Sequence, residues 1–130
     1  MPEEIKKLKI LLIDDDRFLL DMYSLKFKKS GIDIDVLSSS QSALDKLRAG
    51  VEYDIIVIDI IMPGMDGLEL LKAMRDEKIL PKAVVIMLTN QADSFEKAKA
   101  LGANGYIIKA TTIPSEVVEQ VIEIYKTAKK

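Results

Sequence analysis

The chain has 130 residues, a formal net charge of −2, and 48% hydrophobic and 31% charged residues, as expected for one globular domain with its own core. This balance gives no indication of a nucleic-acid or membrane surface, and no apolar stretch approaches the ~20 residues of a membrane-spanning helix. The opening MPEEIKKL lacks the apolar segment of a secretory signal, so we expect a cytoplasmic protein.

Two residue types are missing from the sequence, cysteine and histidine. Their absence excludes disulfides, phosphohistidine, Ser-His nucleophiles and metal sites built from thiolates or imidazoles. A bound metal would need oxygen ligands, which favours Mg²⁺, Mn²⁺ or Ca²⁺ over Zn²⁺.

Apolar runs alternate with helix-forming segments along the chain. The apolar runs predict strands at residues 9–13, 33–37, 55–60, 83–88 and 105–108. Amphipathic spacing and capping residues predict helices at 17–30, at 40–49, after Asp66, at 93–101 and from 114 to about 126. Alternation of this kind favours an α/β fold with a parallel sheet and helices on both faces. We interpret residues 1–130 as a single domain with its core at about 9–126, no output domain, and a solvated tail at 127–130.

Capping residues mark the starts of several predicted helices. Asp66, with Glu69 three residues later, resembles a capping box, in which each side chain bonds the backbone N–H of the other residue. Asp16 is expected to cap the first helix, and Thr112, just ahead of Pro114, is expected to cap the last.

Polar side chains stand at the ends of four predicted strands. Asp14 and Asp15 follow the first strand, Asp59 lies near the end of the third, Thr89 follows the fourth and Lys109 follows the fifth. Because the carboxyl ends of parallel strands share one edge of a sheet, we expect these groups to converge there. Each residue alone could instead be a cap, a turn residue or a solvated surface group. Their common edge favours a shared site.

The chemistry of these groups suits phosphoryl transfer. Crowded carboxylates repel one another, and a divalent cation such as Mg²⁺ relieves that repulsion and retains room for phosphate oxygens. Lys109 offers a positive charge and Thr89 offers a hydroxyl donor. A carboxylate such as Asp59 can attack phosphorus to give an aspartyl phosphate. Catalysis of phosphoryl transfer consists mostly of positioning and charge neutralisation, which these residues supply.

Four motifs resemble the receiver domain of bacterial two-component response regulators, over about residues 9–126. They are IDDD at 13–16, DIIMPGMDG at 59–67, VIMLTN at 85–90 and GYIIK at 105–109. The resemblance implies a flavodoxin-like, doubly wound fold, with five helices flanking a five-stranded parallel sheet of order 2-1-3-4-5. It also implies a phosphoacceptor module of a phosphorelay rather than an enzyme. The donor would be a histidine kinase or a histidine phosphotransfer protein, and the recipient of the signal a downstream protein target or an output domain.

The same resemblance implies the roles of the acidic residues. Asp59 would be the phosphoacceptor. Asp14, Asp15, Asp59 and the backbone carbonyl of Ile61 would bind Mg²⁺, with Mn²⁺ as the other candidate ion. Self-phosphorylation from small donors would be slow.

The resemblance also assigns the residues around the phosphoryl group. Thr89 and Lys109 would contact it. Tyr106 would be an aromatic switch that turns inward as Thr89 moves toward the phosphate, although its spacing is equally consistent with a half-buried strand tyrosine. Ile61 and Gln91 would tune dephosphorylation.

Three positions depart from the family pattern. Ala110 replaces the proline usual after the lysine. Because a cis bond before a non-proline residue costs ~2.5–4 kcal/mol, we predict a trans bond between Lys109 and Ala110. Asn90 replaces a small residue after the threonine, where it would either hinder access to the phosphate or donate to it. Ile61 stands where a polar side chain can position attacking water, which predicts slow self-dephosphorylation.

Two alternative functions stay open on the sequence alone. LIDDD with LTN also resembles motifs of haloacid-dehalogenase-type phosphohydrolases, with Asp14 as nucleophile and Asp16 as acid/base. Against this, the threonine or valine of that family is replaced by Phe18, its late paired carboxylates are missing, and Asp59 would have no role. The other alternative is a receiver-like binding module that is never phosphorylated.

Apolar residues cover more than one face of the first and last predicted helices. These are Phe18, Leu19, Leu20, Met22, Tyr23, Leu25 and Phe27 in the first, and Ile113, Val117, Val118, Val121, Ile122 and Tyr125 in the last. Deep packing against the sheet would explain both sets. Docking of a histidine-containing phosphodonor on the first helix, and homodimer or output contacts through the last helices, would explain them too. We expect no nucleic-acid or membrane contact by this domain.

Overall fold

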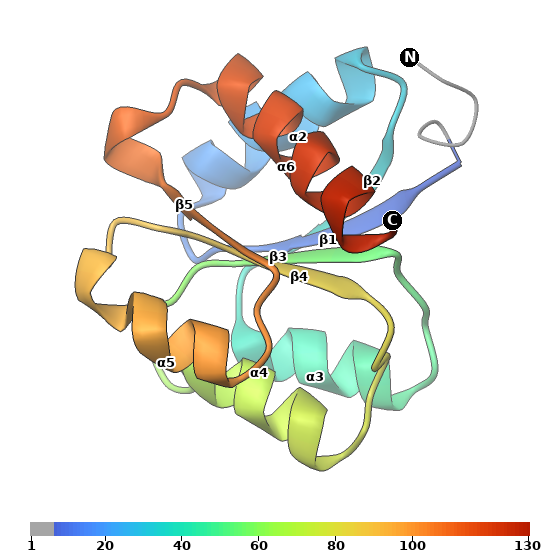
Figure 1. Ribbon diagram of the computed structural model, residues 1–130, viewed down its shortest axis with the longest axis vertical. Helices are drawn as coiled ribbons and strands as arrows, with labels where there is room; N and C mark the ends of the chain where they lie inside the picture. The colour runs from blue at the N-terminus through green and yellow to red at the C-terminus, as the bar shows by residue number, and fades with distance from the viewer. Residues whose placement is uncertain (1–6) are drawn as a thin grey trace.

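Five parallel strands in the order β2-β1-β3-β4-β5 form the central layer of the computed structural model, which describes residues 7–130 (Figure 1). The strands are β1 (Lys9–Ile13), β2 (Asp33–Leu37), β3 (Ile55–Ile58), β4 (Val84–Thr89) and β5 (Gly105–Ile108). The predicted α/β fold and its strand order 2-1-3-4-5 are confirmed.

The predicted bounds of two strands were wrong. β3 ends at Ile58, before Asp59, because the carbonyl of Ile60 accepts a hydrogen bond from the N–H of Gly67 at 2.8 Å rather than joining the ladder. β4 begins at Val84 and includes Thr89, which pairs with Ile108 of β5. Thr89 is therefore held by the sheet itself.

Helices cover both faces of the sheet, as the alternating pattern predicted (Figure 1). On one face lie α2 (Arg17–Lys29) and α6 (Pro114–Ala128); on the other lie α3 (Ser40–Arg48), α4 (Gly67–Asp76) and α5 (Phe95–Ala100). Short 3₁₀ turns, η1 (Ala92–Ser94) and η2 (Lys109–Thr111), precede α5 and follow β5. Among the helices of residues 7–130, none has the length and apolar character needed to cross a membrane.

The caps of α2 and α4 are those predicted. Asp16 Oδ1 accepts from the N–H groups of Phe18 and Leu19 at 3.0 and 3.2 Å. Asp66 and Glu69 form the reciprocal capping box: the N–H of Glu69 donates to Asp66 Oδ1 at 2.8 Å, and the N–H of Asp66 donates to Glu69 Oε1 at 3.2 Å. These caps fix where each helix leaves the loop that precedes it.

The last helix begins at Pro114 as predicted, but its predicted cap and its predicted end were wrong. Thr112 does not cap α6. Ile113 occupies the capping position, and its N–H donates to the carboxylate of Glu116 at 3.3 Å. The helix continues to Ala128, because neither glycine nor proline follows Lys126 to stop it, so half of the predicted tail is helical.

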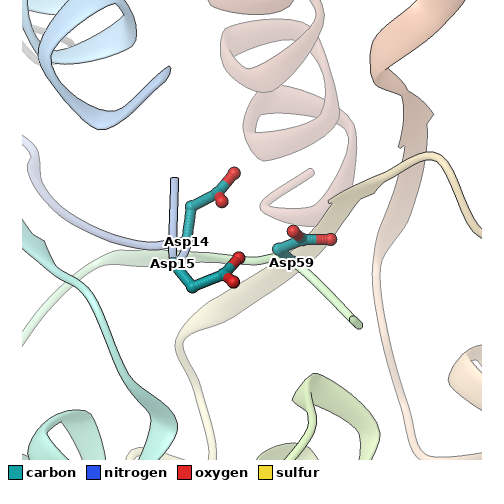
Figure 2. Close-up of side chains that lie close together, drawn as sticks. All are labelled: Asp14, Asp15 and Asp59. Carbon is teal, nitrogen blue, oxygen red and sulfur yellow. The ribbon is translucent and has the colours of Figure 1, made fainter. Parts of the chain in front are cut away.

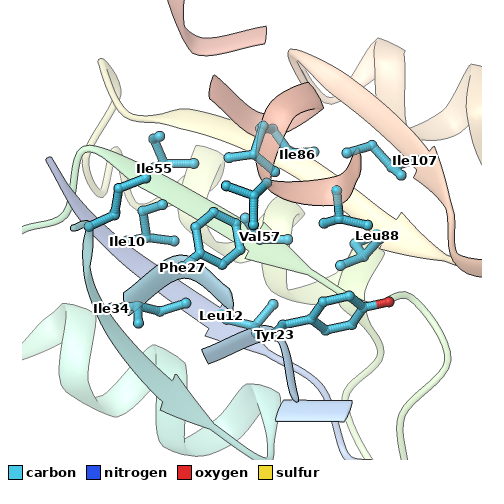
Figure 3. Close-up of a cluster of buried hydrophobic side chains, with 14 of the residues drawn as sticks. Ile10, Leu12, Tyr23, Phe27, Ile34, Ile55, Val57, Ile86, Leu88 and Ile107 are labelled. Atoms are coloured by element: carbon cyan, nitrogen blue, oxygen red, sulfur yellow. The ribbon is translucent and has the colours of Figure 1, made fainter. Parts of the chain in front are cut away.

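The central strands are apolar throughout because both of their faces are covered. In β1, Ile10 and Leu12 pack toward α2 and α6, while Leu11 and Ile13 pack toward α3 and α4. Figure 3 shows the first of these two layers, with the ring of Phe27 lying among side chains of the sheet and fully buried. Close packing on both faces makes the strands rigid supports for the residues at their carboxyl ends.

Candidate functional site

The carboxylates of Asp14, Asp15 and Asp59 meet at the carboxyl edge of the sheet (Figure 2). Strand register brings them together: Ile13 pairs with Ile58, so the next residue in each strand, Asp14 and Asp59, comes to the same place. One oxygen from each of the three carboxylates lies within 4.8 Å of the others. Asp14 and Asp59 are buried, whereas Asp15 is exposed. This cluster could hold a metal ion.

Lys109 extends from the end of β5 to the same cluster. Its Nζ donates to Asp14 Oδ2 at 2.5 Å and to Asp59 Oδ2 at 2.9 Å, and its side chain is only 10% exposed. The peptide bond between Lys109 and Ala110 is trans, as predicted. The amine therefore reaches both carboxylates without the proline that usually follows it in the resembled family.

The charges of these groups do not balance. Burial raises the pKa of Asp14. The hydrogen bonds from Lys109 and from the N–H of Asp16 lower that pKa, but by less, so it stays above its ordinary value. Burial opposes the charge of Lys109, but its hydrogen bonds to Asp14 and Asp59 prevail and raise its pKa. With all groups ionised, three carboxylates and one ammonium carry −3 + 1 = −2 charges. The site thus favours a further cation or a proton.

Thr89 and Tyr106 are connected through the backbone of Gln91. Thr89 is fully buried, and its Oγ1 accepts from the N–H of Gln91 at 3.2 Å. The hydroxyl of Tyr106 donates to the carbonyl of Gln91. The Tyr106 ring is half-buried and meets the edge of Phe95, with centroids 5.6 Å apart. A shift of the Gln91 backbone would therefore alter one hydrogen bond of each side chain.

Ile61 lies in the loop between β3 and α4, and its side chain is 59% exposed. A methyl group added at Gly67, which begins α4, would stand 2.1 Å from the carbonyl oxygen of Asp59. Only glycine therefore lets α4 begin this close to Asp59. Sequence analysis included Gly67 only as the end of the DIIMPGMDG motif and missed this contact.

Tyr23 is a second residue near the site that sequence analysis did not single out. It is 2% exposed within the core layer of α2, and Figure 3 shows its hydroxyl at one end of that layer. Burial raises the pKa of the Tyr23 hydroxyl; the charge of Lys109 lowers it, and those of Asp14 and Asp59 raise it. The sequence signal was ambiguous, because a tyrosine on an apolar helix stripe is usually a core residue.

The sequence pattern described as "Response regulator receiver domain" matches residues 10–122. The chain belongs to this family. Among curated relatives of this receiver domain, the alkaline phosphatase synthesis transcriptional regulatory protein PhoP of Bacillus subtilis is 32% identical over 120 residues, covering 91% of this chain and 48% of that protein. The DNA-binding response regulator MtrA of Mycobacterium tuberculosis is 30% identical over 115 residues, covering 87% and 48%. The receiver domain thus spans about half the length of these relatives.

Solved receiver structures resemble this one closely. The receiver domain of the Francisella response regulator 1452 is 33% identical, with a TM-score of 0.80, covering 93% of this chain and 98% of that one. Vibrio cholerae chemotaxis protein CheY4 is 26% identical, with a TM-score of 0.81 and coverage of 90% and 98%. Thermotoga maritima TrrA, solved in complex with Mg(2+)-BeF, is 28% identical, with a TM-score of 0.77 and coverage of 90% and 98%.

Family membership settles the class of function. Receiver domains are phosphoacceptor signalling modules of two-component systems, which act together with histidine kinases and output domains. They bind Mg²⁺ through an acidic cluster, and this chain has such a cluster. The haloacid-dehalogenase interpretation of the first acidic motif is therefore not retained.

Proposed function

We propose that this receiver domain accepts a phosphoryl group on the carboxylate of Asp59. The observation that carries the proposal is the position of Asp59, which lies beside Asp14 and Asp15 and is bonded to Lys109 at 2.9 Å. Asp14, Asp15, Asp59 and the backbone carbonyl of Ile61 would hold Mg²⁺ or Mn²⁺. All-oxygen ligands of this charge suit such ions, and the bound ion supplies positive charge for the phosphoryl oxygens.

In the proposed reaction, an oxygen of Asp59 forms a bond to phosphorus as the donor's bond to phosphorus breaks. The leaving group keeps the electron pair of that bond, and the product is an aspartyl phosphate. Lys109 already donates to Asp59 and would transfer that hydrogen bond to a phosphoryl oxygen. The Thr89 hydroxyl at the end of β4 would donate to another. Rigid strands hold both groups, which suits a reaction that depends on positioning.

The donor is proposed to dock on the apolar surface beside this site. In α2, Leu20, Tyr23 and Phe27 are buried in the core, whereas Phe18 is 75% exposed and Leu25 is 54% exposed. Deep packing therefore accounts for the buried residues, and donor docking is proposed for the exposed ones. Phe18 stands three residues after Asp15 of the acidic cluster, so the exposed apolar surface begins near that cluster. It suits a histidine kinase or a histidine phosphotransfer protein.

The last helix offers less free apolar surface than its sequence suggested. Val117, Val118 and Val121 are buried against the sheet, and Ile113 is the large apolar residue of this region that stays exposed, at 60%. Homodimer, downstream-target or output contacts through this helix stay predictions, and Ile113 is the residue to test.

The proposal is tested by intact mass after incubation with Mg²⁺ and acetyl phosphate. The wild-type chain should gain the mass of one phosphoryl group, and chelation of Mg²⁺ should prevent the gain. A chain that gains no mass from acetyl phosphate or from any phosphohistidine donor would instead be a receiver-like module that signals only by binding.

Asp15→Asn is expected to weaken Mg²⁺ binding without loss of stability. Asp15 is exposed while its two partners are buried, so the substitution removes one metal oxygen and leaves the core intact. We expect the Mg²⁺ concentration for half-maximal phosphorylation to rise about tenfold or more. Asp21→Asn, which changes an exposed aspartate of α2, is the control. An unchanged Mg²⁺ requirement in Asp15→Asn would contradict the proposed ligand set.

Ile61→Asn is expected to shorten the lifetime of the phosphorylated state. An apolar side chain at this exposed loop position cannot orient an attacking water, whereas an amide can. The measurement is the decay of the phosphorylated mass after the donor is removed. Ile113→Asn is a matched control, because its side chain is 60% exposed against 59% for Ile61. If both variants decay at the wild-type rate, Ile61 does not control water access.

A further inference from the structure

Asn90 connects the segment that follows Thr89 with the segment that follows Lys109. Its Oδ1 accepts a hydrogen bond from the backbone N–H of Ala110 at 2.8 Å, across 20 residues of sequence. Sequence analysis expected Asn90 either to hinder access to the phosphate or to donate to it. In the structure its oxygen is instead an acceptor for Ala110.

The bond lies where the β-ladder between the two strands stops. Thr89 and Ile108 are the last paired residues of β4 and β5, and the ladder does not continue beyond them. The side chain of Asn90 bridges the two segments at this point, so the residues immediately after Thr89 and after Lys109 remain connected. The connection extends the support of the sheet into the loops at the phosphoryl site.

The backbone after Lys109 forms a short turn that has no side-chain cap of its own. Lys109 begins this three-residue turn, η2. Two hydrogen bonds to backbone carbonyls at this turn are long: the N–H of Thr112 donates to the carbonyl of Lys109 at 3.3 Å, and Thr111 Oγ1 donates to the carbonyl of Ile108 at 3.4 Å. At 2.8 Å, the bond from the Ala110 N–H to Asn90 is shorter than both of these, and it ties the backbone of the turn to the segment that follows β4.

We propose that Asn90 is a positioning residue that acts through Ala110 to hold the Lys109 ammonium at the acceptor carboxylate. The inference rests on the proposed phosphorylation of Asp59. It links two departures from the family pattern, Asn90 and Ala110. The bond needs both of them, because a proline at position 110 would have no N–H to donate to Asn90. The long side chain of Lys109 is flexible, so its reach to Asp14 and Asp59 depends on where its backbone is held.

Amide exchange tests the bond without reference to phosphorylation. In Asn90→Leu, which keeps the side-chain size but removes the acceptor, exchange of the Ala110 N–H should accelerate about fivefold or more. Asn90→Asp restores a carboxylate oxygen as acceptor and should restore the protection. If exchange at Ala110 were unchanged in Asn90→Leu, the bond would be absent and the inference overturned.

A double-mutant comparison tests whether the bond acts through Lys109. The measured quantity is the rate of phosphoryl gain from acetyl phosphate at saturating Mg²⁺. We expect Asn90→Leu to slow the wild-type reaction about fivefold, but to cause no further slowing in a chain that already carries Lys109→Met. Equal slowing in both backgrounds would mean that Asn90 acts on Thr89 or on access instead, and no slowing in the wild type would remove the role altogether.

These outcomes separate the inference from the function on which it rests. If the wild type gained no phosphoryl group from any donor, the proposed function would fail and the inference with it. If the wild type and Asn90→Leu gained it equally fast, only the inference would fail.

Discussion

Asp59→Asn is expected to abolish phosphorylation while leaving the protein folded. An amide keeps the size of the carboxylate but is a poor nucleophile, so no aspartyl phosphate can form at this position. Asp59 is 7% exposed and lies beside two other carboxylates, so neutralising it also relieves repulsion with Asp14 and Asp15. Intact mass after incubation with Mg²⁺ and acetyl phosphate should show no gain, with an unchanged or higher thermal midpoint.

The control for this substitution is an aspartate outside the site. Asp76 is 62% exposed and pairs with Lys72 on the surface of α4, so Asp76→Asn should be phosphorylated like the wild type. A phosphoryl group that persisted in Asp59→Asn but disappeared in Asp14→Asn would move the nucleophile to the end of β1, which is the hydrolase-like alternative.

Lys109→Met is expected to destabilise the protein strongly in the absence of Mg²⁺. The substitution leaves Asp14, whose side chain is 2% exposed, without its cationic partner at 2.5 Å. Removing one member of a buried ion pair typically costs about 3–5 kcal/mol, because the remaining charge stays uncompensated. The measurement is chemical denaturation in a chelating buffer at neutral pH. Added Mg²⁺ should recover much of the loss, because an ion that binds only the folded state stabilises it.

The loss should also depend on pH in a defined direction. The pKa of Asp14 is raised above its ordinary value of 3.8, so the folded protein favours the protonated carboxyl. The contribution of Asp14 to stability is therefore most favourable below pH 3.8 and is lost as the pH rises through its folded pKa. The stability difference between Lys109→Met and wild type should shrink as the pH falls through that range.

A surface lysine with the same kind of bond provides the control for Lys109. Lys72 lies 2.6 Å from Asp76, close to the 2.5 Å of the Lys109–Asp14 pair, but its side chain is 64% exposed. Lys72→Met should change stability by at most about 1 kcal/mol, because water screens exposed pairs. If Lys109→Met and Lys72→Met were equally stable in chelating buffer, burial would not determine how much the Lys109 pair contributes to stability.

The sequence was sufficient to predict what depends on local pattern. Apolar runs identified the strands, and the rule that carboxyl ends of parallel strands share an edge brought Asp14, Asp59, Thr89 and Lys109 to one place. The structure confirms this convergence for Asp14, Asp59 and Lys109 through direct hydrogen bonds. Thr89 ends β4 on the same edge.

What the sequence did not predict depends on contacts between distant segments. The collision that any side chain at Gly67 would make with the carbonyl of Asp59 depends on how closely α4 approaches the end of β3. The bond between Asn90 and Ala110 depends on how two segments approach each other beyond the last ladder pair. The cap of α6 was assigned to Thr112 by residue preference, whereas the structure uses the side chain of Glu116.

The most direct test of the account is to locate the phosphoryl group chemically. Borohydride reduces an aspartyl phosphate to homoserine, and peptide mass mapping then shows which aspartate was modified. We expect homoserine at position 59 after incubation with Mg²⁺ and acetyl phosphate, and none when Mg²⁺ is chelated. Homoserine at position 14 instead, or a phosphoryl group that resists reduction because it sits on a hydroxyl, would contradict Asp59 as the acceptor.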